Sequence, residues 1–144
     1  MTIKKRFMKR ILVIEDDKNI AAALAIRLEA ANYEVTTASN GLEGLKQILE
    51  NRPDLIVMDI WMPIGMGFSV AERLHGLGLS GIPIVFITAS KQTGLLEAAK
   101  ELGAVAFFEK PYDAEQLLET ICTALRSKEL PNRAPMRSVA TSLC

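Results

Sequence analysis

The fold is decided by residues 53–63, which read Pro-Asp-Leu-Ile-Val-Met-Asp-Ile-Trp-Met-Pro. Within this stretch, residues 55–58 form an unbroken apolar run that suits a strand buried on both faces and is too short for a helix. The run ends at the carboxylate of Asp59, just before a segment rich in proline and glycine. Parallel-sheet proteins bind ligands at the carboxyl ends of their strands. Because an ionised carboxylate buried there is costly without a cationic partner, we expect the chain to supply one.

The length and composition favour one globular domain. The chain has 144 residues, of which 49% are hydrophobic and 24% are charged, so it can build a substantial core. No apolar run approaches the ~20 residues of a membrane span, and no signal-peptide pattern opens the chain, so no membrane contact is expected. The two cysteines, Cys122 and Cys144, are too far apart for a zinc motif and too few for a disulfide framework, which favours a reducing cytoplasm.

Charge is unevenly distributed along a chain whose net charge is zero. Residues 1–10 carry +5, residues 127–144 carry +2, and the body between them carries −7. An acidic body disfavours a nucleic-acid surface and suits a site for cations. The basic amino-terminal arm, residues 1–8, contains a single aromatic residue, Phe7, so a solvated tail is favoured over an anion-binding arm. Residues 127–144 are interpreted as a tail or a truncated linker, because 18 residues cannot form a second domain.

The pattern of the body predicts an alternation of strands and helices. Short apolar runs predict strands at 11–14, 33–37, 55–58, 82–87 and 105–108, and apolar residues at helical spacing predict helices at 20–31, 42–49, 70–77, 95–102 and 113–125. Asn32 and Gly103 are expected to end two of these helices, and Asp113 is expected to cap the last. Alternating strands and helices require a parallel sheet with helices on both faces.

Reactive side chains recur where the predicted strands end. Glu15 and Asp16 follow the first strand, Asp59 ends the third, Thr88 ends the fourth, and Lys110 follows the fifth. For these groups to meet, the four strands must be neighbours. The flavodoxin-like order 2-1-3-4-5 provides this, so we expect an α/β, doubly wound, five-stranded parallel sheet.

These groups together favour phosphoryl transfer. Carboxylates held close together repel one another by roughly 1 to 4 kcal/mol per pair, depending on the local dielectric. Magnesium relieves that repulsion, and it accepts two carboxylates, a carbonyl and several waters while keeping positions open for phosphate oxygens. The hydroxyl of Thr88 and the ammonium of Lys110 suit an anion. The set therefore predicts transfer of a phosphoryl group to a carboxylate, with the metal and the lysine neutralising its charge.

Four motifs resemble the receiver domain of two-component response regulators, across residues 9–126. They are Ile-Leu-Val-Ile-Glu-Asp-Asp at 11–17, Asp-Leu-Ile-Val-Met-Asp-x-x-Met-Pro at 54–63, Ile-Val-Phe-Ile-Thr-Ala at 84–89 and Lys-Pro at 110–111. Each motif is weak alone, whereas all four in this order and spacing are highly specific. The chain is similar to the chemotaxis-regulator-like receivers that consist of a single domain.

The resemblance implies a role for each acidic residue. Asp59 would accept a phosphoryl group from the phosphohistidine of a sensor histidine kinase or a phosphotransfer protein. Asp16 would bind Mg²⁺ directly and Glu15 through water, and the backbone carbonyl of Trp61 would be a further metal ligand. Such a domain catalyses only its own phosphorylation and dephosphorylation, so we do not expect an enzyme that acts on external substrates.

The resemblance also implies how phosphate is held and how the signal leaves. Thr88 and Lys110 would hold the phosphoryl oxygens, helped by backbone N–H groups near Ile60 and Ala89. Phe107 lies at the family's aromatic switch position and would turn inward as Thr88 moves toward the phosphate. The Lys110–Pro111 peptide bond would be cis. The fourth helix (95–102), fifth strand (105–108) and fifth helix (113–125) would then be repacked for a downstream protein, an output domain or a second copy of the chain. No direct contact with nucleic acid is expected.

One loop departs from the family pattern. Residues 62–67 read Met-Pro-Ile-Gly-Met-Gly, where the family usually has Met-Pro-x-Met-Asp-Gly. Gly65 therefore replaces the common methionine, and Met66 replaces the common acid. This loop is expected to shape the mouth of the site, so the departure bears on loop geometry and not on activity.

Structural interpretations of the same residues compete with the functional ones. Residues 15–17 fit a helix start favoured by the dipole, and Phe107 fits an ordinary core residue. His75, near the end of a predicted helix, fits a surface residue that complements the dipole better than a phosphodonor. Residues 76–81 match Gly-x-Gly-x-x-Gly but precede a strand, which is the wrong context for a dinucleotide site.

Two rival functions remain open. A Mg²⁺-dependent phosphohydrolase of the haloacid dehalogenase-like kind would carry a second acid two residues after its nucleophile. Asp59 is instead followed by Ile60 and Trp61. A pseudo-receiver would act only as a binding module, and the intact set of acids, hydroxyl and lysine disfavours it.

Overall fold

The computed structural model describes residues 8–60, 67–89 and 94–129. These residues form five strands, β1 (Arg10–Ile14), β2 (Glu34–Ala38), β3 (Leu55–Asp59), β4 (Ile84–Thr88) and β5 (Ala106–Glu109). They also form five helices, α2 (Lys18–Ala30), α3 (Gly41–Glu50), α4 (Gly67–Gly76), α5 (Leu95–Glu101) and α6 (Ala114–Glu129). No described helix has both the length and the hydropathy needed to cross a bilayer.

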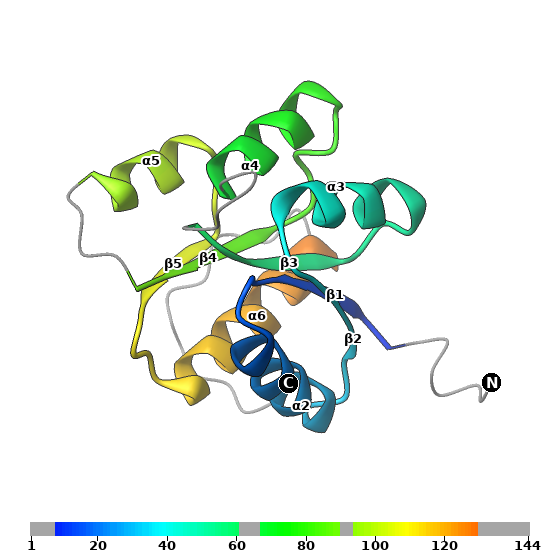
Figure 1. The fold of residues 1–144 in the computed structure, drawn as a ribbon, viewed down its shortest axis with the longest axis vertical. Helices are drawn as coiled ribbons and strands as arrows, with labels where there is room; N and C mark the ends of the chain where they lie inside the picture. The colour runs from blue at the N-terminus through cyan, green and yellow to red at the C-terminus, as the bar shows by residue number, and fades with distance from the viewer. Residues whose placement is uncertain (1–7, 61–66, 90–93, 130–144) are drawn as a thin grey trace.

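The sheet has the expected topology. All neighbouring strands are parallel, and their order is β2-β1-β3-β4-β5. Helices α3, α4 and α5 lie on one face, and α2 and α6 lie on the other (Figure 1). The flavodoxin-like doubly wound fold is thus confirmed. Its central strand, β3, has β1 on one side and β4 on the other, so the end of β3 lies in the middle of the carboxyl edge of the sheet.

Alternate residues of the central strands enter two separate cores. Leu55 and Val57 of β3 pack on the side of α2 and α6, whereas Ile56 and Met58 pack on the side of α3, α4 and α5. Every residue of β3 is buried. This explains why the strand is a continuous apolar run rather than an alternating one: both of its faces are removed from water.

Several expected helix ends are confirmed. Asn32 follows α2 with a positive φ of 74°, the conformation that often ends a helix, and Gly103 follows α5 with a φ of 79°. The Oδ1 atom of Asp113 accepts a hydrogen bond of 2.9 Å from the amide of Glu115 at the start of α6. These local signals therefore fix where three of the helices begin or end.

The element bounds differ from the sequence expectation by at most four residues. β4 begins at Ile84 rather than at residue 82, because Pro83 has no N–H to donate to the ladder. The carbonyl of Pro83 still accepts a hydrogen bond of 3.0 Å from the amide of Ile56. α6 runs to Glu129, three residues past the expected domain end at 126.

Candidate functional site

Three carboxylates meet at the carboxyl edge of the sheet. Glu15 directly follows β1 and is 2% exposed, and Asp59 ends β3 and is 6% exposed. Asp16 is exposed beside them. One carboxylate oxygen from each of the three lies within 4.8 Å of the others. The two strands are neighbours in register, so the sheet itself brings these acids together.

Lys110 supplies the cationic partner expected for Asp59. Its Nζ atom donates to Oε1 of Glu15 at 3.1 Å and to Oδ2 of Asp59 at 3.2 Å. The lysine side chain is 18% exposed, so the bridge is largely withdrawn from water. Charge-assisted hydrogen bonds of this kind are stronger than neutral ones. One ammonium therefore neutralises part of the charge on two buried carboxylates that lie 44 residues apart in the chain.

The local environment shifts the protonation of both Glu15 and Lys110. Burial raises the pKa of Glu15 from 4.5 to about 7, and the negative charge of Asp59 adds to this, while hydrogen bonds from Asp17 and Lys110 act in the opposite direction. Burial lowers the pKa of Lys110, but the two carboxylates outweigh it and the pKa rises above its ordinary value. Lys110 is therefore charged at neutral pH, whereas Glu15 is close to half-protonated.

Thr88 and Ala89 extend the site along β4. Thr88 is the last residue of β4 and is fully buried, and Ala89 is exposed just beyond it. Asp59 pairs with Ile87 in the register of the sheet, so Thr88 lies one step further toward the edge. The carbonyl of Thr88 accepts a hydrogen bond of 2.7 Å from the amide of Lys110. The sheet thus brings the expected anion-binding residues beside the carboxylates.

The amide of Ile60 is engaged elsewhere. Ile60 is fully buried, and its N–H donates to the carbonyl of Ile87 at 3.1 Å, which continues the ladder between β3 and β4. The Ile60 amide itself is therefore bound within the sheet in this conformation, and the expected phosphate-binding N–H near Ile60 stays a prediction. Trp61, Gly65 and Met66 lie outside the described residues.

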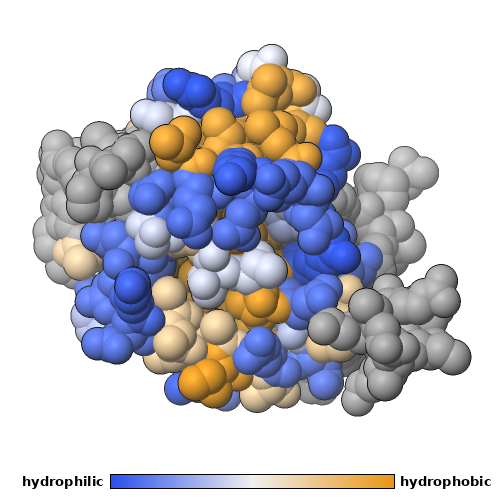
Figure 2. Space-filling model, turned by 45° about the vertical axis from the view of Figure 1, so that its right-hand side comes forward, coloured by the Kyte–Doolittle hydropathy of each residue, from blue (hydrophilic) through white to orange (hydrophobic). Residues whose placement is uncertain are grey.

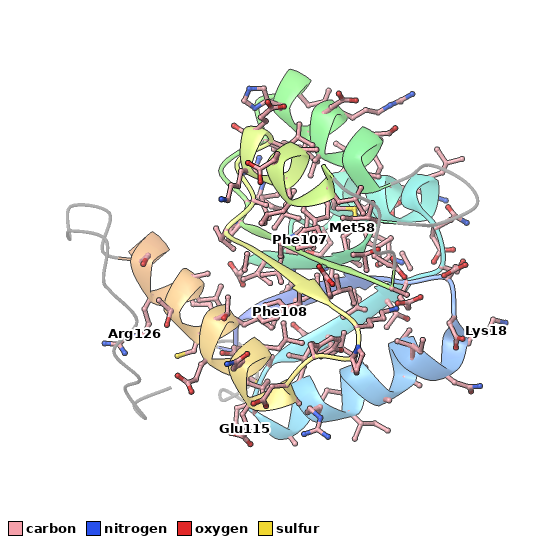
Figure 3. All side chains as sticks on the ribbon, turned by 90° about the vertical axis from the view of Figure 1, so that its left-hand side faces the viewer. Lys18, Met58, Phe107, Phe108, Glu115 and Arg126 are labelled. Carbon is pink, nitrogen blue, oxygen red and sulfur yellow. The ribbon has the colours of Figure 1, made fainter. Side chains whose placement is uncertain are left out.

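The aromatic residues of β5 point to opposite faces of the sheet. Phe107 is half-buried and packs against the core on the side of α3, α4 and α5. Phe108 packs on the other side, with its ring centroid 6.1 Å from that of Tyr112, and Figure 3 shows the two phenylalanines diverging from the strand. The Lys110–Pro111 bond is cis, as expected. Phe107 thus lies on the side of the sheet that α5 covers, and its switch role stays a prediction.

The acidic run at 15–17 divides into two roles. Asp17 caps α2, and its Oδ1 atom accepts hydrogen bonds from the amides of Asn19 at 2.9 Å and Ile20 at 3.1 Å. The helix-start interpretation therefore holds for Asp17, whereas Glu15 and Asp16 belong to the carboxylate cluster. The Asp17 amide also donates to Oε2 of Glu15 at 3.1 Å, a contact that the sequence pattern did not indicate.

His75 and residues 76–81, for which the sequence favoured a structural interpretation, lie in the expected elements. His75 is exposed in the last turn of α4, where its dipole-complementing role applies. Residues 76–81 connect α4 to the segment before β4, and Gly78 has a positive φ of 76°. The Gly-x-Gly-x-x-Gly match is therefore a helix-to-strand connection and not a dinucleotide loop.

Comparisons with known proteins agree on one family. Residues 11–122 match the family model of the response regulator receiver domain. The chain is 39% identical over 121 residues to the transcriptional regulatory protein DltR of Streptococcus agalactiae, covering 84% of this chain and 54% of DltR. It is 32% identical over 132 residues to the response regulator ArlR of Staphylococcus saprophyticus, covering 92% of this chain and 59% of ArlR. The chain spans about half the length of these curated relatives.

Solved structures that are similar to this chain belong to receiver-type proteins as well. A CheY-like receiver domain protein of Methanospirillum hungatei has a TM-score of 0.81 at 30% identity, covering 87% of this chain and 99% of that chain. The chemotaxis protein CheY4 of Vibrio cholerae has a TM-score of 0.74 at 29% identity, covering 81% of this chain and 98% of that chain. The chain belongs to the response regulator receiver domain family of two-component systems.

Proposed function

We propose that Asp59 accepts a phosphoryl group from the phosphohistidine of a sensor histidine kinase or phosphotransfer protein. A carboxylate oxygen of Asp59 attacks phosphorus, the bond from phosphorus to the donor imidazole nitrogen breaks, and that nitrogen keeps the electron pair. The observation that carries the proposal is the ion bridge in which Lys110 contacts both Asp59 and Glu15 at the end of β3. Receiver domains are signalling domains rather than classical enzymes, so the chain would catalyse only its own phosphorylation and dephosphorylation.

The carboxylate cluster would hold the metal. Glu15, Asp16 and Asp59 offer oxygens within 4.8 Å of one another, a donor set that suits a hard divalent cation. Asp16 is the exposed member and would bind Mg²⁺ directly, with Glu15 acting through water and the carbonyl of Trp61 as a further ligand. When bound, Mg²⁺ would neutralise charge on the phosphoryl oxygens. The Lys110 ammonium contacts two of these three acids, and a dication would offset further negative charge in the cluster.

The phosphoryl oxygens would be held by groups from β4 and β5. Lys110 already lies 3.2 Å from Asp59 and can turn from the carboxylate to the phosphate. Thr88 would contribute its hydroxyl and Ala89 its backbone N–H, because both lie at the carboxyl end of β4 next to the end of β3. These groups supply one full charge and two dipolar donors for an anion of about −1.5 to −2 charge.

The signal would leave through α5, β5 and α6. Movement of Thr88 toward the phosphate would open space beside β5, and Phe107 would turn into it, changing the face formed by these three elements. The support is geometric: Thr88 pairs with Glu109, and Phe107 lies on the same side of the sheet as α5. The downstream partner would be a protein, an output domain or a second copy of the chain, and not nucleic acid directly.

The domain organisation of the whole protein bears on its output. The curated relatives are transcriptional regulators and response regulators about twice as long as the aligned region. We propose a receiver at 9–126, preceded by a basic arm at 1–8 and followed at 127–144 by a tail or a linker to an output domain. The sequence immediately beyond Cys144 in the gene would decide between the last two.

We propose a cytoplasmic location, where sensor kinases hold their phosphohistidine. Cys122 is buried on α6, and two cysteines are too few for a disulfide framework. Thiol alkylation of the protein in intact cells tests the proposal. Reduced Cys122 would support the proposal, and an oxidised residue would contradict it.

Phosphorylation by a small donor tests the proposed function. With acetyl phosphate and Mg²⁺, we expect one phosphoryl group per chain, detected by intact-mass analysis, and none after chelation of the metal. Failure to incorporate phosphate would favour the pseudo-receiver. Sustained turnover of small phosphate esters would instead favour the phosphohydrolase.

Magnesium affinity should rise with pH between 6 and 8. Because the pKa of Glu15 is about 7, this group is mostly neutral at pH 6 and mostly ionised at pH 8, and only the ionised form attracts the cation. For one controlling group, the dissociation constant should fall by up to about tenfold over this range. Lys110, whose pKa is raised, stays charged throughout. Calorimetric titration at several pH values measures the effect, and Glu15→Gln should flatten it. An equally steep pH dependence in that variant would assign the effect to another group.

A further inference from the structure

Asp17 makes hydrogen bonds in two directions along the chain. Its Oδ1 atom accepts hydrogen bonds from the amides of Asn19 and Ile20, and its carbonyl oxygen accepts one of 2.9 Å from the amide of Ala21. Its own amide donates backwards, to Oε2 of Glu15 at 3.1 Å. The side chain of this residue therefore fixes the first turn of α2, while its amide holds a member of the carboxylate cluster.

Glu15 is held at its backbone and at both carboxylate oxygens. Its amide donates to the carbonyl of Ala38 at 2.9 Å, which extends the pairing of β1 with β2. Oε1 accepts from Nζ of Lys110, and Oε2 accepts from the Asp17 amide. Because Glu15 is buried, its oxygens depend on donors from the protein rather than on bulk water. Each of these two donors therefore orients one oxygen.

The two donors would behave differently during phosphoryl transfer. Lys110 is proposed to turn from the carboxylates toward the phosphoryl group, so its contact with Glu15 would weaken when Asp59 is modified. The amide of Asp17 is part of the backbone, where φ is −83° and ψ is 112°, the extended conformation usual for a residue that caps a helix. It cannot swing away as a lysine side chain can. Asp17 would therefore keep Oε2 of Glu15 in place after the lysine has left.

The same arrangement restrains the backbone of Asp16. This residue lies between Glu15, whose amide is bound to β2, and Asp17, from which α2 begins. The exposed carboxylate of Asp16 reaches the cluster from a backbone that is held on both sides. A change at the start of α2 would therefore displace both members of the acidic pair. Removing groups that orient metal ligands typically weakens metal binding by about 10- to 100-fold.

We propose that Asp17 is a positioning residue for the magnesium site: by capping α2 it aims its own amide at Oε2 of Glu15. Its carboxylate is occupied by the helix cap and acts on the site through Glu15. The inference rests on the proposed function for the identity of the metal, whereas the contact between Asp17 and Glu15 does not. It also connects the two interpretations of residues 15–17, because the helix start is what orders the acidic pair.

Asp17→Ala and Asp17→Asn separate the cap from the charge. Both variants remove the negative charge of Asp17, but asparagine caps a helix about as well as aspartate, and alanine does not. We expect the dissociation constant for Mg²⁺ to rise by about tenfold in Asp17→Ala, the lower end of the range for groups that orient metal ligands. In Asp17→Asn it should stay close to the wild-type value at physiological salt, because screening weakens the effect of an exposed charge. Calorimetric titration measures both constants.

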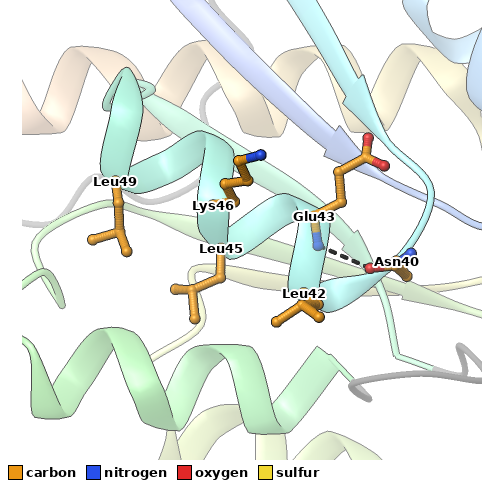
Figure 4. A pocket seen from close by; sticks show the side chains of 6 residues that line it. All are labelled: Asn40, Leu42, Glu43, Leu45, Lys46 and Leu49. Atoms are coloured by element: carbon orange, nitrogen blue, oxygen red, sulfur yellow. Dashed lines mark hydrogen bonds between the residues drawn. The ribbon is translucent and has the colours of Figure 1, made fainter.

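Asn40→Ala is the matched control for the loss of a helix cap. The Oδ1 atom of Asn40 accepts a hydrogen bond of 2.8 Å from the Glu43 amide at the start of α3, drawn as a dashed line in Figure 4. Asn40 borders a groove of about 520 Å³ whose other lining residues all belong to α3 and include no member of the carboxylate cluster. Figure 2 shows apolar residues gathered in the upper part of the molecule, where Figure 1 places α3 and α4. Asn40→Ala should therefore lower the melting temperature but leave the affinity for Mg²⁺ unchanged.

Amide hydrogen exchange in the metal-free chain tests the contact itself. We expect the Asp17 amide to be protected in the wild-type protein, which requires no variant to fold. In Glu15→Ala, which removes the acceptor, that amide should exchange severalfold faster, whereas the Ala21 amide within α2 should change little. Neither metal nor phosphate enters this measurement. Its failure is therefore distinct from a failure of the proposed function.

Four outcomes would overturn the inference. The first is an unprotected Asp17 amide in the wild-type chain, and the second is a wild-type affinity for Mg²⁺ in Asp17→Ala. The third is an equal loss of affinity in Asp17→Ala and Asp17→Asn, which would assign the effect to charge. The fourth is the same loss in Asn40→Ala, which would assign it to general stability. If the wild-type chain bound no Mg²⁺ at all, the proposed metal site and this role of Asp17 would both be wrong.

Discussion

Asp59→Asn should lower phosphoryl incorporation from acetyl phosphate to background. The amide cannot act as the nucleophile, and it removes one of the three carboxylate groups proposed to hold Mg²⁺. The Lys110 ammonium would keep its bond to Glu15 but lose its ionic contact with residue 59. Intact-mass analysis in the presence of Mg²⁺ measures the loss. We expect magnesium affinity to fall as well, because the remaining acids provide less negative charge.

Asp54→Asn is the matched control for this variant. Asp54 lies next to the opposite end of β3, and its carboxylate accepts a hydrogen bond from the Arg10 amide. The variant removes an identical charge from the same segment without touching the carboxyl edge of the sheet. It should therefore keep phosphoryl incorporation at the wild-type level. Incorporation that persists in Asp59→Asn would mean that another residue accepts the phosphate.

Lys110→Met should destabilise the metal-free protein by about 2 to 4 kcal/mol at pH 8. Breaking a buried ion pair by removing one partner typically costs about 3 to 5 kcal/mol, and the partial exposure of Lys110 reduces this. Two buried carboxylates, Glu15 and Asp59, would face each other without their shared ammonium. Urea unfolding at matched protein concentration measures the loss, and Lys100→Met, on the exposed side of α5, should change stability little.

The pH dependence of this loss identifies its cause. Lys110 lowers the pKa of Glu15, so its removal raises that pKa above about 7. At pH 6 the carboxyl group would be protonated and the repulsion small, whereas at pH 8 the repulsion would be strong. The destabilisation should therefore be larger at pH 8 and should be partly restored by Mg²⁺. An equal loss at both pH values would indicate lost packing of the lysine stem instead.

Much of the fold follows from the sequence because local and long-range signals agree. The run Leu55–Met58 is apolar on both sides of the strand, and only a sheet covered on both faces buries it fully. Asp59 and Lys110 lie 51 residues apart, yet each lies at the carboxyl end of a strand whose place in the sheet is set by the alternation of strands and helices. The contacts of Lys110 with Glu15 and Asp59 therefore agree with the strand order expected from the sequence.

The remaining features depend on contacts that no local pattern specifies. Which of Asp16 and Asp17 caps α2 is decided by the hydrogen bonds to Asn19 and Ile20. The sequence places Ile60 beside Asp59, but only the register of β3 against β4 shows that its amide is bound to Ile87. The bond between Arg10 and Asn51 joins residues 41 positions apart, and nothing near either residue in the chain predicts it.

The division of the interior into two cores also sorts the residues of the site. Glu15 and Asp59 continue the rows of Val13 and Val57, which face α2 and α6, and Lys110 continues the row of Phe108 on that side. Thr88 and Phe107 belong to the rows that face α3, α4 and α5. The sheet therefore separates the ion pairs of Lys110, on the side of α2 and α6, from the proposed switch residues Thr88 and Phe107, on the side of α3, α4 and α5. The proposed phosphoryl group on Asp59 would lie at the edge of the sheet, within reach of residues from both sides, so its arrival on one side would be signalled to the other.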